Sequence, residues 1–347
     1  SFQNKKAVNP SQKHFIPSNL YEPDLVEVQF EVKPLAFLSD EDSISLELLD
    51  LAEGAKISAE NYPLNLVDGK LITSLFLPEG ATIAYRYRLV QPVEVPELLS
   101  DGTPLPFRQL LVRKNLKVSD IIAGWTENSY QGALVDLNGV VADDKTEAPI
   151  PDILVNVSGK TALTDMNGRF YIRGLPEGLH NLVATSNDGS YLTFQQEVNM
   201  VETLSTMAIV RMQAAKAVTL TFVVNQPQDS PQLPLRISGN LRQFGLTWQD
   251  MLSGKGAQPI NMPLLIKNED GQNINQIKVY AGSYLRYQYT IGDANINSER
   301  DSEGKKYVRE FVVPEKDIVI NDTIASWHTE QNGEINFSVR IPESTPS

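Results

Sequence analysis

The sequence predicts an all-β chain made of three antiparallel β-sandwich domains in series, and three observations indicate this fold class. Short segments that alternate apolar and polar residues recur along the 347 residues. Turn-forming groups such as Val67-Asp68-Gly69-Lys70 separate them. One residue pattern also occurs twice, about 200 positions apart. We expect a leader over 1–24, sandwiches over 25–126, 132–213 and 217–328, and a tail over 329–347.

The leader and the first sandwich follow from these local patterns. Prolines interrupt the first 24 residues, which have no strand or helix periodicity, so we expect an extended leader. Val26, Val28, Phe30 and Val32 then alternate with polar residues and predict one half-buried strand, which Pro34 ends. Similar strands are expected within 44–48, 71–77, 83–89 and 109–112.

The repeat joins the first and third sandwiches. Both contain a Tyr-x-Tyr pair, then an arginine that opens an apolar run, then the pattern Asp-x-Ile-Ala-x-Trp. These elements are Tyr85 and Tyr87, Arg108, and Asp120 to Trp125 in the first copy, and Tyr287 and Tyr289, Arg309, and Asp322 to Trp327 in the second. One module therefore occurs twice, and we expect one strand order in both copies. Trp125 and Trp327 are expected to pack at strand ends, and Trp327 is expected to be largely buried.

The middle segment has a different pattern. It contains Gly139-Val-Val, a proline before its second strand, Thr164-Asp165-Met-Asn167-Gly168-Arg-Phe170, and Leu175-Pro-Glu-Gly178. Asn167-Gly168 suits a hairpin turn, and Phe170 is expected in the core. This pattern resembles the carboxypeptidase regulatory-like module, a seven-stranded transthyretin-like (prealbumin-like) sandwich. The resemblance implies a non-catalytic spacer or stabiliser.

The repeated module resembles the starch-binding domains of carbohydrate-binding module family 20, which have an immunoglobulin-like sandwich fold. The second copy carries Gly239-Asn240, Phe244-Gly245 and Trp248 in the family's order. The resemblance implies that aromatic rings stack on successive sugars while Asn or Lys holds hydroxyl groups. Trp248 and Asn240 are therefore candidate carbohydrate-binding residues. The second ring is absent from 292–297, and the first copy lacks both rings; the alternative is that Trp248 packs a short helical turn at 247–252 onto the sandwich.

Composition excludes several classes of protein. The 30 Lys and Arg residues against 43 Asp and Glu leave a net charge of −13, without a basic stripe for nucleic acid. Cysteine is absent, which excludes disulfides, thiolate metal sites and cysteine nucleophiles. No apolar run is long enough to insert into a membrane. The three histidines, His14, His180 and His328, lack helical partners, so we predict no metal site. The sequence also has no recognised catalytic or nucleotide-binding motif, so we predict no cofactor, no catalytic residue and no enzyme activity.

The tail carries the last strand pattern. Ile335, Phe337, Val339 and Ile341 alternate with polar residues, and Pro342 follows them. A lone strand with one apolar face needs other strands. The chain is then either one piece of a longer array or a donor of this strand to a neighbouring copy, and we favour donation.

These observations lead to two hypotheses about function. The first is a non-enzymatic, secreted or cell-surface structural or adhesive protein that assembles head-to-tail into a filament or surface layer. The second is an α-glucan-binding protein, or a non-catalytic part of a larger secreted glycoside hydrolase. Self is the expected partner in the first hypothesis and a glycan in the second. Because the junctions at 126–132 and 214–217 are short, we expect the three sandwiches to form a fixed rod.

Overall fold

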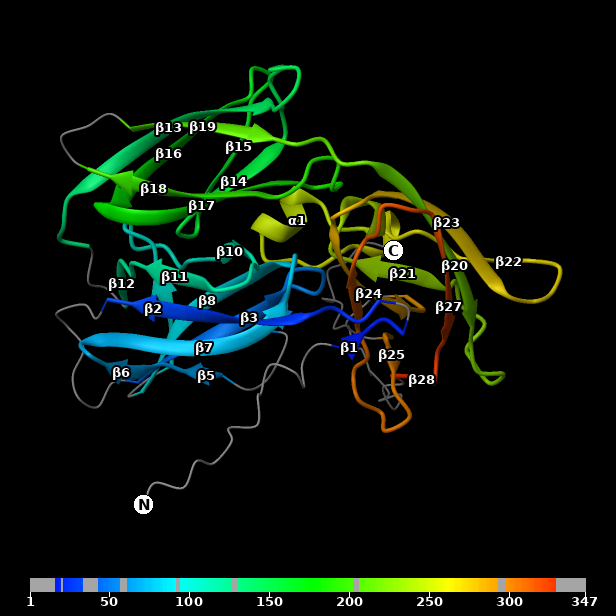
Figure 1. Ribbon diagram of the computed structural model, residues 1–347. Coiled ribbons are helices and arrows are strands. Elements are labelled where there is room, and N and C mark those ends of the chain that lie inside the picture. Colours follow the sequence, from blue (N-terminus) through cyan, green and yellow to red (C-terminus); the bar gives the residue numbers. More distant parts are fainter. Residues whose placement is uncertain are drawn as a thin grey trace, which may run out of the picture.

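A computed structural model of the chain describes residues 16–19, 21–33, 43–56, 61–91, 94–125, 130–201, 206–292 and 297–328. It is nearly all β and contains three sandwiches, which Figure 1 shows in blue to cyan, in green and in yellow to red. Each has its own buried apolar cluster, formed by residues from the ranges 26–125, 135–212 and 218–324, and Tyr284 of the third sandwich also packs in the first cluster.

The first sandwich is built around the predicted opening strand. Val28, Phe30 and Val32 on β2 are buried, as their alternation predicts. One sheet has the order β11-β2-β7-β6, and the other joins β12, β9, β8, β3 and β4, with β10 also paired to β8. The strands are β2 (Leu25–Val32), β3 (Ser43–Asp50), β4 (Ala55–Lys56), β5 (Tyr62–Pro63), β6 (Asn65–Val67), β7 (Lys70–Pro78), β8 (Thr82–Gln91), β9 (Val95–Leu98), β10 (Arg108–Leu111), β11 (Leu116–Asp120) and β12 (Gly124–Trp125).

The third sandwich repeats this strand order. Its first sheet runs β27-β20-β23-β22, and its second contains β26-β24-β21. In both copies the opening strand pairs in parallel with the penultimate strand, β2 with β11 and β20 with β27. The elements are β20 (Ala217–Asn225), β21 (Arg236–Gly239), η2 (Arg242–Phe244), α1 (Trp248–Leu252), η3 (Pro259–Asn261), β22 (Ile266–Lys267), β23 (Asn273–Tyr280), β24 (Tyr284–Thr290), β25 (Glu299–Arg300), β26 (Arg309–Val312), β27 (Ile318–Thr323) and β28 (Ser326–Trp327). The predicted repeat of strand order is confirmed.

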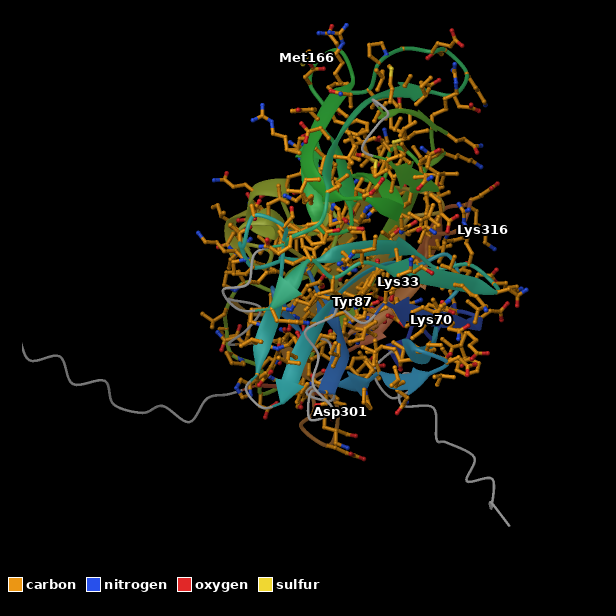
Figure 2. All side chains as sticks on the ribbon, turned by 90° about the vertical axis from the view of Figure 1, so that its left-hand side faces the viewer. Lys33, Lys70, Tyr87, Met166, Asp301 and Lys316 are labelled. Carbon is orange, nitrogen blue, oxygen red and sulfur yellow. The ribbon has the colours of Figure 1, made fainter. Side chains whose placement is uncertain are left out.

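The middle sandwich has sheets of three and four strands, in the orders β16-β13-β19 and β15-β14-β17-β18. Phe170 is buried as predicted, directly opposite Gly139 on the neighbouring strand. Met166, which is 80% exposed, lies at the outer tip of this sandwich, far from Lys70 and Asp301 (Figure 2). The strands are β13 (Leu134–Asp143), β14 (Ile153–Val157), β15 (Lys160–Leu163), β16 (Arg169–Pro176), β17 (Gly178–Ser186), β18 (Phe194–Met200) and β19 (Thr206–Met212).

A short strand from the leader belongs to the third sandwich, although the leader precedes the first. Strand β1 (Ile16–Pro17) pairs in parallel with β26 and extends the sheet β26-β24-β21 (Figure 1). The backbone N–H of Ser18 donates to the carbonyl of Glu310 at 3.1 Å. Tyr21 packs against Phe311, with their ring centroids 5.8 Å apart. The leader thus supplies the edge strand of a distant sheet.

The three sandwiches pack against one another as a compact triangle, so the predicted rod is wrong. The first and third approach closely at the backbone, where the N–H of Ala257 donates to the carbonyl of Ala52 at 2.7 Å. The first and middle sandwiches are joined by a hydrogen bond, in which the backbone N–H of Leu111 donates to Oε1 of Gln195 at 2.7 Å. Short junctions limit the distance between sandwiches that follow each other in the sequence, but they do not set the angle between those sandwiches.

The two tryptophans that end the repeated modules lie on strands paired to a glutamate. Trp125 pairs with Glu97 and is buried, whereas Trp327 pairs with Glu299 and is only half-buried. The indole N–H of Trp327 donates to Ser230 Oγ at 2.9 Å. Trp125 agrees with the expected packing at a strand end. Trp327 packs against the third core but is only partly buried, so the expectation that it is largely buried is wrong.

Candidate functional site

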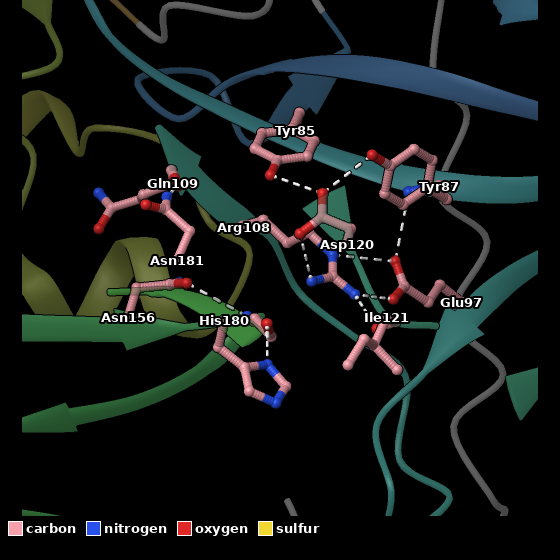
Figure 3. Close-up of polar contacts among 12 residues, drawn as sticks. Tyr85, Tyr87, Glu97, Arg108, Gln109, Asp120, Ile121, Asn156, His180 and Asn181 are labelled. Atoms are coloured by element: carbon pink, nitrogen blue, oxygen red, sulfur yellow. Dashed lines mark hydrogen bonds and ion pairs between the residues drawn. The ribbon is translucent and has the colours of Figure 1, made fainter. Parts of the chain in front are cut away.

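A cluster of buried polar side chains connects four strands inside the first sandwich (Figure 3). The hydroxyls of Tyr85 and Tyr87 on β8 donate to Oδ2 of Asp120 on β11, at 2.8 and 2.9 Å. Arg108 on β10 donates to the other oxygen of that carboxylate at 3.1 Å and also to Glu97 on β9. Glu97 in turn accepts the backbone N–H of Tyr87 at 3.4 Å.

The third sandwich contains the same cluster. Tyr287 and Tyr289 donate to Oδ2 of Asp322 at 2.9 and 2.7 Å. Nη1 of Arg309 donates to Glu299 at 2.5 Å, and its Nε lies 3.2 Å from Asp322 Oδ1. Glu299 also accepts the backbone N–H of Tyr289 at 2.8 Å. The repeated Tyr-x-Tyr, Arg and Asp residues therefore converge on one structural unit in each copy.

Burial and the neighbouring charges set the protonation states of the tyrosines and the arginine in the first cluster. Burial, and then the charge of the nearby aspartate, raises the pKa of Tyr85 and Tyr87 well above the ordinary value, so both remain neutral donors. Burial disfavours the charge on Arg108, but Glu97 and Asp120 hold its pKa above the usual range. Each cluster therefore acts as a polar connection between strands.

Sequence reasoning missed the two glutamates of these clusters. Glu97 and Glu299 lie on short strands with no marked alternation, and no motif singled them out. They do occupy equivalent places, since each pairs with the terminal tryptophan of its module. A full alignment of the two copies would have identified them.

A further set of buried charges joins the first and third sandwiches. Nη1 of Arg286 on β24 donates to Glu310 on β26 at 2.5 Å, and its Nη2 donates to Asp50 of the first sandwich at 3.2 Å. Nearby, Gln288 donates to Glu53 of the first sandwich at 2.6 Å, and Lys306 pairs with the same carboxylate. Burial raises the pKa of Glu310 to about 7, even though Arg286 acts in the opposite direction.

A cavity lies where the three sandwiches meet. Its volume is about 90 Å³. Its lining mixes apolar side chains with polar ones from all three sandwiches, including Ala84 and Gln109 of the first, Thr185 of the middle one, and Trp248, Asn240 and Ser283 of the third. Both predicted carbohydrate-binding residues and all three sandwiches come together at this cavity.

Trp248 does not present the exposed ring face that sugar stacking requires, and this corrects the expectation from the sequence. The side chain is 9% exposed and packs in an apolar cluster with Phe107, Leu154 and Met251. Its indole N–H donates to the carbonyl of Asp152 in the middle sandwich at 3.0 Å. Trp248 is the first residue of helix α1. Its position therefore matches the alternative given above, in which Trp248 packs a short helical turn onto the sandwich.

The side chain of Asn240 is also occupied by contacts within the protein. Its amide nitrogen donates to the carbonyl of Tyr284 at 2.9 Å, and its amide oxygen accepts the N–H of Arg286 at 2.8 Å. These bonds fix the loop after β21 to strand β24. The side chain that was predicted to hold a sugar hydroxyl is thus used on the protein's own backbone.

The predicted assembly strand lies outside the described residues. Ile335, Phe337, Val339 and Ile341 all fall within 329–347, so their role stays a prediction.

The histidines in the described ranges do not form a metal site. The buried His180 ring donates from Nε2 to the carbonyl of Pro176 at 2.6 Å and contacts Ser158 Oγ through Nδ1 at 2.7 Å. Burial lowers its pKa, which favours the neutral ring. Within those ranges, no group of three or more His, Asp or Glu side chains could hold a metal ion. No helix in the described part of the chain is long and apolar enough to cross a membrane.

Comparison with solved structures finds pilins and a glucoamylase. A streptococcal ancillary pilin is 11% identical, with a TM-score of 0.30 over 87% of this chain and 99% of that one. A minor pilin of Streptococcus agalactiae is 12% identical, with a TM-score of 0.30 over 59% of this chain and 100% of that one. A family 15 glucoamylase of Hypocrea jecorina is 16% identical, with a TM-score of 0.25 over 35% of this chain and 20% of that one. No family model and no curated protein sequence matches the chain.

Proposed function

We propose that this chain is a non-enzymatic structural protein of the cell exterior that assembles head-to-tail with copies of itself. In this assembly, the segment 334–342 of one copy adds as a strand to a sandwich of the next copy. The location outside the cell is supported by the resemblance of the modules to types found on secreted enzymes.

The observation that carries the proposal is the position of β1. This strand comes from the leader, yet it completes a sheet edge in the third sandwich, with β26 as its parallel neighbour. Backbone bonding and the packing of Tyr21 on Phe311 hold the segment there. A segment outside the three sandwiches therefore acts as an added strand, which is the interaction that strand donation between copies requires.

The tail has the sequence of a second such strand, and the first sandwich offers an edge for it. Strand β6 pairs only with β7 among the described residues. It exposes Leu66, which is 68% exposed, and Val67. Exposed apolar side chains on an edge strand are unusual in a monomeric protein, because such an edge tends to pair with a strand of another chain. A donated tail with one apolar face would cover them.

The test compares assembly of the full chain with that of tail variants by light scattering and electron microscopy. We expect deletion of 334–347 to abolish polymers while near-ultraviolet circular dichroism remains that of folded sandwiches. Phe337→Asp should have the same effect because it places a charge on the apolar face of the strand. Ser338→Asp adds the same charge on the opposite face and should leave polymers intact.

The acceptor edge has its own variant. Leu66→Asp should weaken assembly without unfolding the chain, since this side chain is exposed in the isolated copy. A chain that stays monomeric at all concentrations, or polymers that persist after the deletion, would overturn the proposal.

A further inference from the structure

The outer face of one sheet in the third sandwich is apolar. It belongs to the sheet β22-β23-β20-β27, which lies on the side away from the other two sandwiches (Figure 1). Cross-strand pairing places Ile266, Ile274 and Val223 in one row on this face, and Val319 faces outward on the edge strand β27. Ile266 is 69% exposed and Val319 is 53% exposed. An exposed apolar patch of this kind indicates a surface that another molecule covers.

The first sandwich shows that the repeated module does not require an apolar face here. The two copies align through the buried aspartates of their polar clusters, so Val223 and Val319 occupy the places of Glu31 and Lys117. In the first copy, Glu31 accepts a hydrogen bond from Lys70 at 2.6 Å on this face. The strand order is the same in both copies, yet only the third has valine where the first has charges. The valines therefore reflect what this face contacts, and not how the module folds.

Charges at the two ends of β23 indicate which partner fits this face. The turn before β23 carries Glu269 and Asp270, Lys278 points outward near the other end of the strand, and all three side chains are exposed. Ile274 lies about midway between these ends. A two-fold axis at Ile274 would lay β23 of one copy antiparallel to β23 of another. Lys278 of each copy would then meet Glu269 and Asp270 of the other, which makes the face complementary to itself.

We propose that the face formed by Ile266, Ile274, Val223 and Val319 binds the same face of a second copy in this two-fold arrangement. The chain carries a net charge of −13, so two copies repel each other over much of their surfaces. The outward positions of β20, β23 and β27 carry no carboxylate, so two copies can approach closely here. The contact goes beyond the proposed head-to-tail assembly, because it joins copies side by side and does not use the tail.

The size of the face predicts a reversible contact. A face about 20 Å wide and about 20 Å long covers roughly 400 Å² per copy at the usual spacing of strands and residues. Stable interfaces bury about 800 Å² on each partner, and smaller ones belong to weak or transient complexes. We therefore expect a dimer that exchanges with monomers and depends on protein concentration.

The test uses the full chain with Phe337→Asp, which is designed to block donation of the tail strand. Analytical ultracentrifugation from low to high micromolar concentration should show a reversible dimer. Val223→Glu introduces the residue of the first copy and should weaken the dimer at least about tenfold, because two carboxylates then meet near the axis. Met207→Glu is the matched control. Met207 on β19 of the middle sandwich is 63% exposed, so the same charge at this position should leave the dimer unchanged.

An exchange of charges tests the two-fold orientation. Lys278→Glu should weaken the dimer, because like charges then meet at both ends of the face. The pair Glu269→Lys and Asp270→Lys should weaken it for the same reason. The combination of all three substitutions should restore the dimer, since opposite charges meet again with their positions exchanged.

Several results would overturn the inference. One is a Phe337→Asp chain that stays monomeric at every concentration; protection of its tail from protease would show that the tail covers the face instead. Others are a dimer that persists in Val223→Glu and a dimer that the combined charge exchange does not restore. Polymers that form despite Phe337→Asp would reject strand donation alone, and only a lack of effect of Val223→Glu on them would reject the face contact as well.

Discussion

Arg108 holds a positive charge in the interior of the first sandwich, where Glu97 and Asp120 balance it. Replacing two charged groups by apolar ones can be neutral for stability, but removing one partner leaves the others buried and unpaired. Arg108→Met removes the cation and leaves both carboxylates. We expect a loss of about 3–5 kcal/mol in the free energy of unfolding, measured by urea denaturation.

Arg211→Met is the matched control for this residue. Arg211 pairs with Glu147 on the surface of the middle sandwich at 3.1 Å, and both side chains are exposed. Exposed pairs contribute about 0–1 kcal/mol. Equal effects of the two substitutions would show that the buried cluster does not stabilise the first sandwich.

At the same scale, sequence analysis identified part of each cluster. Tyr85, Tyr87, Arg108 and Asp120 were found because the repeat contains them twice, but their meeting point was not predicted. Alternation assigns a side chain to a face of its own strand, and says nothing about which distant strand lies opposite. Trp248 shows what a sequence motif cannot predict. Its position in the residue order of the starch-binding family was recognisable, but its burial depends on contacts with the middle sandwich.

On the scale of the element, Gly139 allows two strands of the middle sandwich to pack. It lies on β13 directly opposite Phe170 on β16. A Cβ at this position would overlap the Phe170 ring and lie 2.8 Å from the carbonyl oxygen of Ala208. Gly139→Ala should therefore cost about 1–3 kcal/mol or more through overpacking, measured as a shift of the urea midpoint.

Asn138→Ala tests whether the effect belongs to the glycine or to the strand. Asn138 is the preceding residue on β13, and its side chain is exposed. We expect a change within about 0.5 kcal/mol, as for other surface positions. A Gly139→Ala variant as stable as Asn138→Ala would contradict the close packing of the Phe170 ring.

Strands were predictable from the sequence to different degrees. The long strand β2 has regular alternation, and its structure matches the predicted face. By contrast, β1, β25 and β28 are two residues long, too short to carry a periodic signal. Their positions depend on partners distant in sequence, as the pairing of β1 with β26 shows.

For the whole molecule, buried carboxyls predict how stability depends on pH. Burial raises the pKa of Glu299 and Glu310 to about 7, from an ordinary value of 4.5. The folded chain then binds protons more tightly than the unfolded chain between these values. Stability from these groups is present below about pH 4.5 and is lost as pH rises through about 7. We expect a higher urea midpoint near pH 5 than near pH 8.

Other groups modify this profile and make a control necessary. The pKa of buried His180 is lowered, so its contribution has the opposite sign and decreases as pH falls below 6.5. Protonation also reduces the net negative charge of the chain. Glu310→Gln should therefore reduce the pH dependence, whereas Glu303→Gln, an exposed position, should leave it unchanged. An unchanged profile in Glu310→Gln would contradict the raised pKa.

The arrangement of the three sandwiches was not predictable from the sequence. Asp50 and Glu53 of the first sandwich bind Arg286, Gln288 and Lys306 of the third, and no sequence pattern singled them out. Nothing local distinguishes an acid that faces solvent from one that faces another domain. The short junctions predicted a rod because they restrict the separation of consecutive sandwiches. The triangular arrangement instead depends on side-chain contacts between the sandwiches.

The cross-strand pair Arg286–Glu310 has a consequence for folding, because two similar sandwiches in one chain can exchange strands by mistake. At the equivalent register of the first sandwich, Ala84 faces Gln109. If β24 paired with β10, Arg286 would face an amide in place of a carboxylate; if β8 paired with β26, Glu310 would face a methyl group. Each misfolded pairing would bury a charge without its cross-strand counter-charge, so this difference between the copies favours correct over swapped partners.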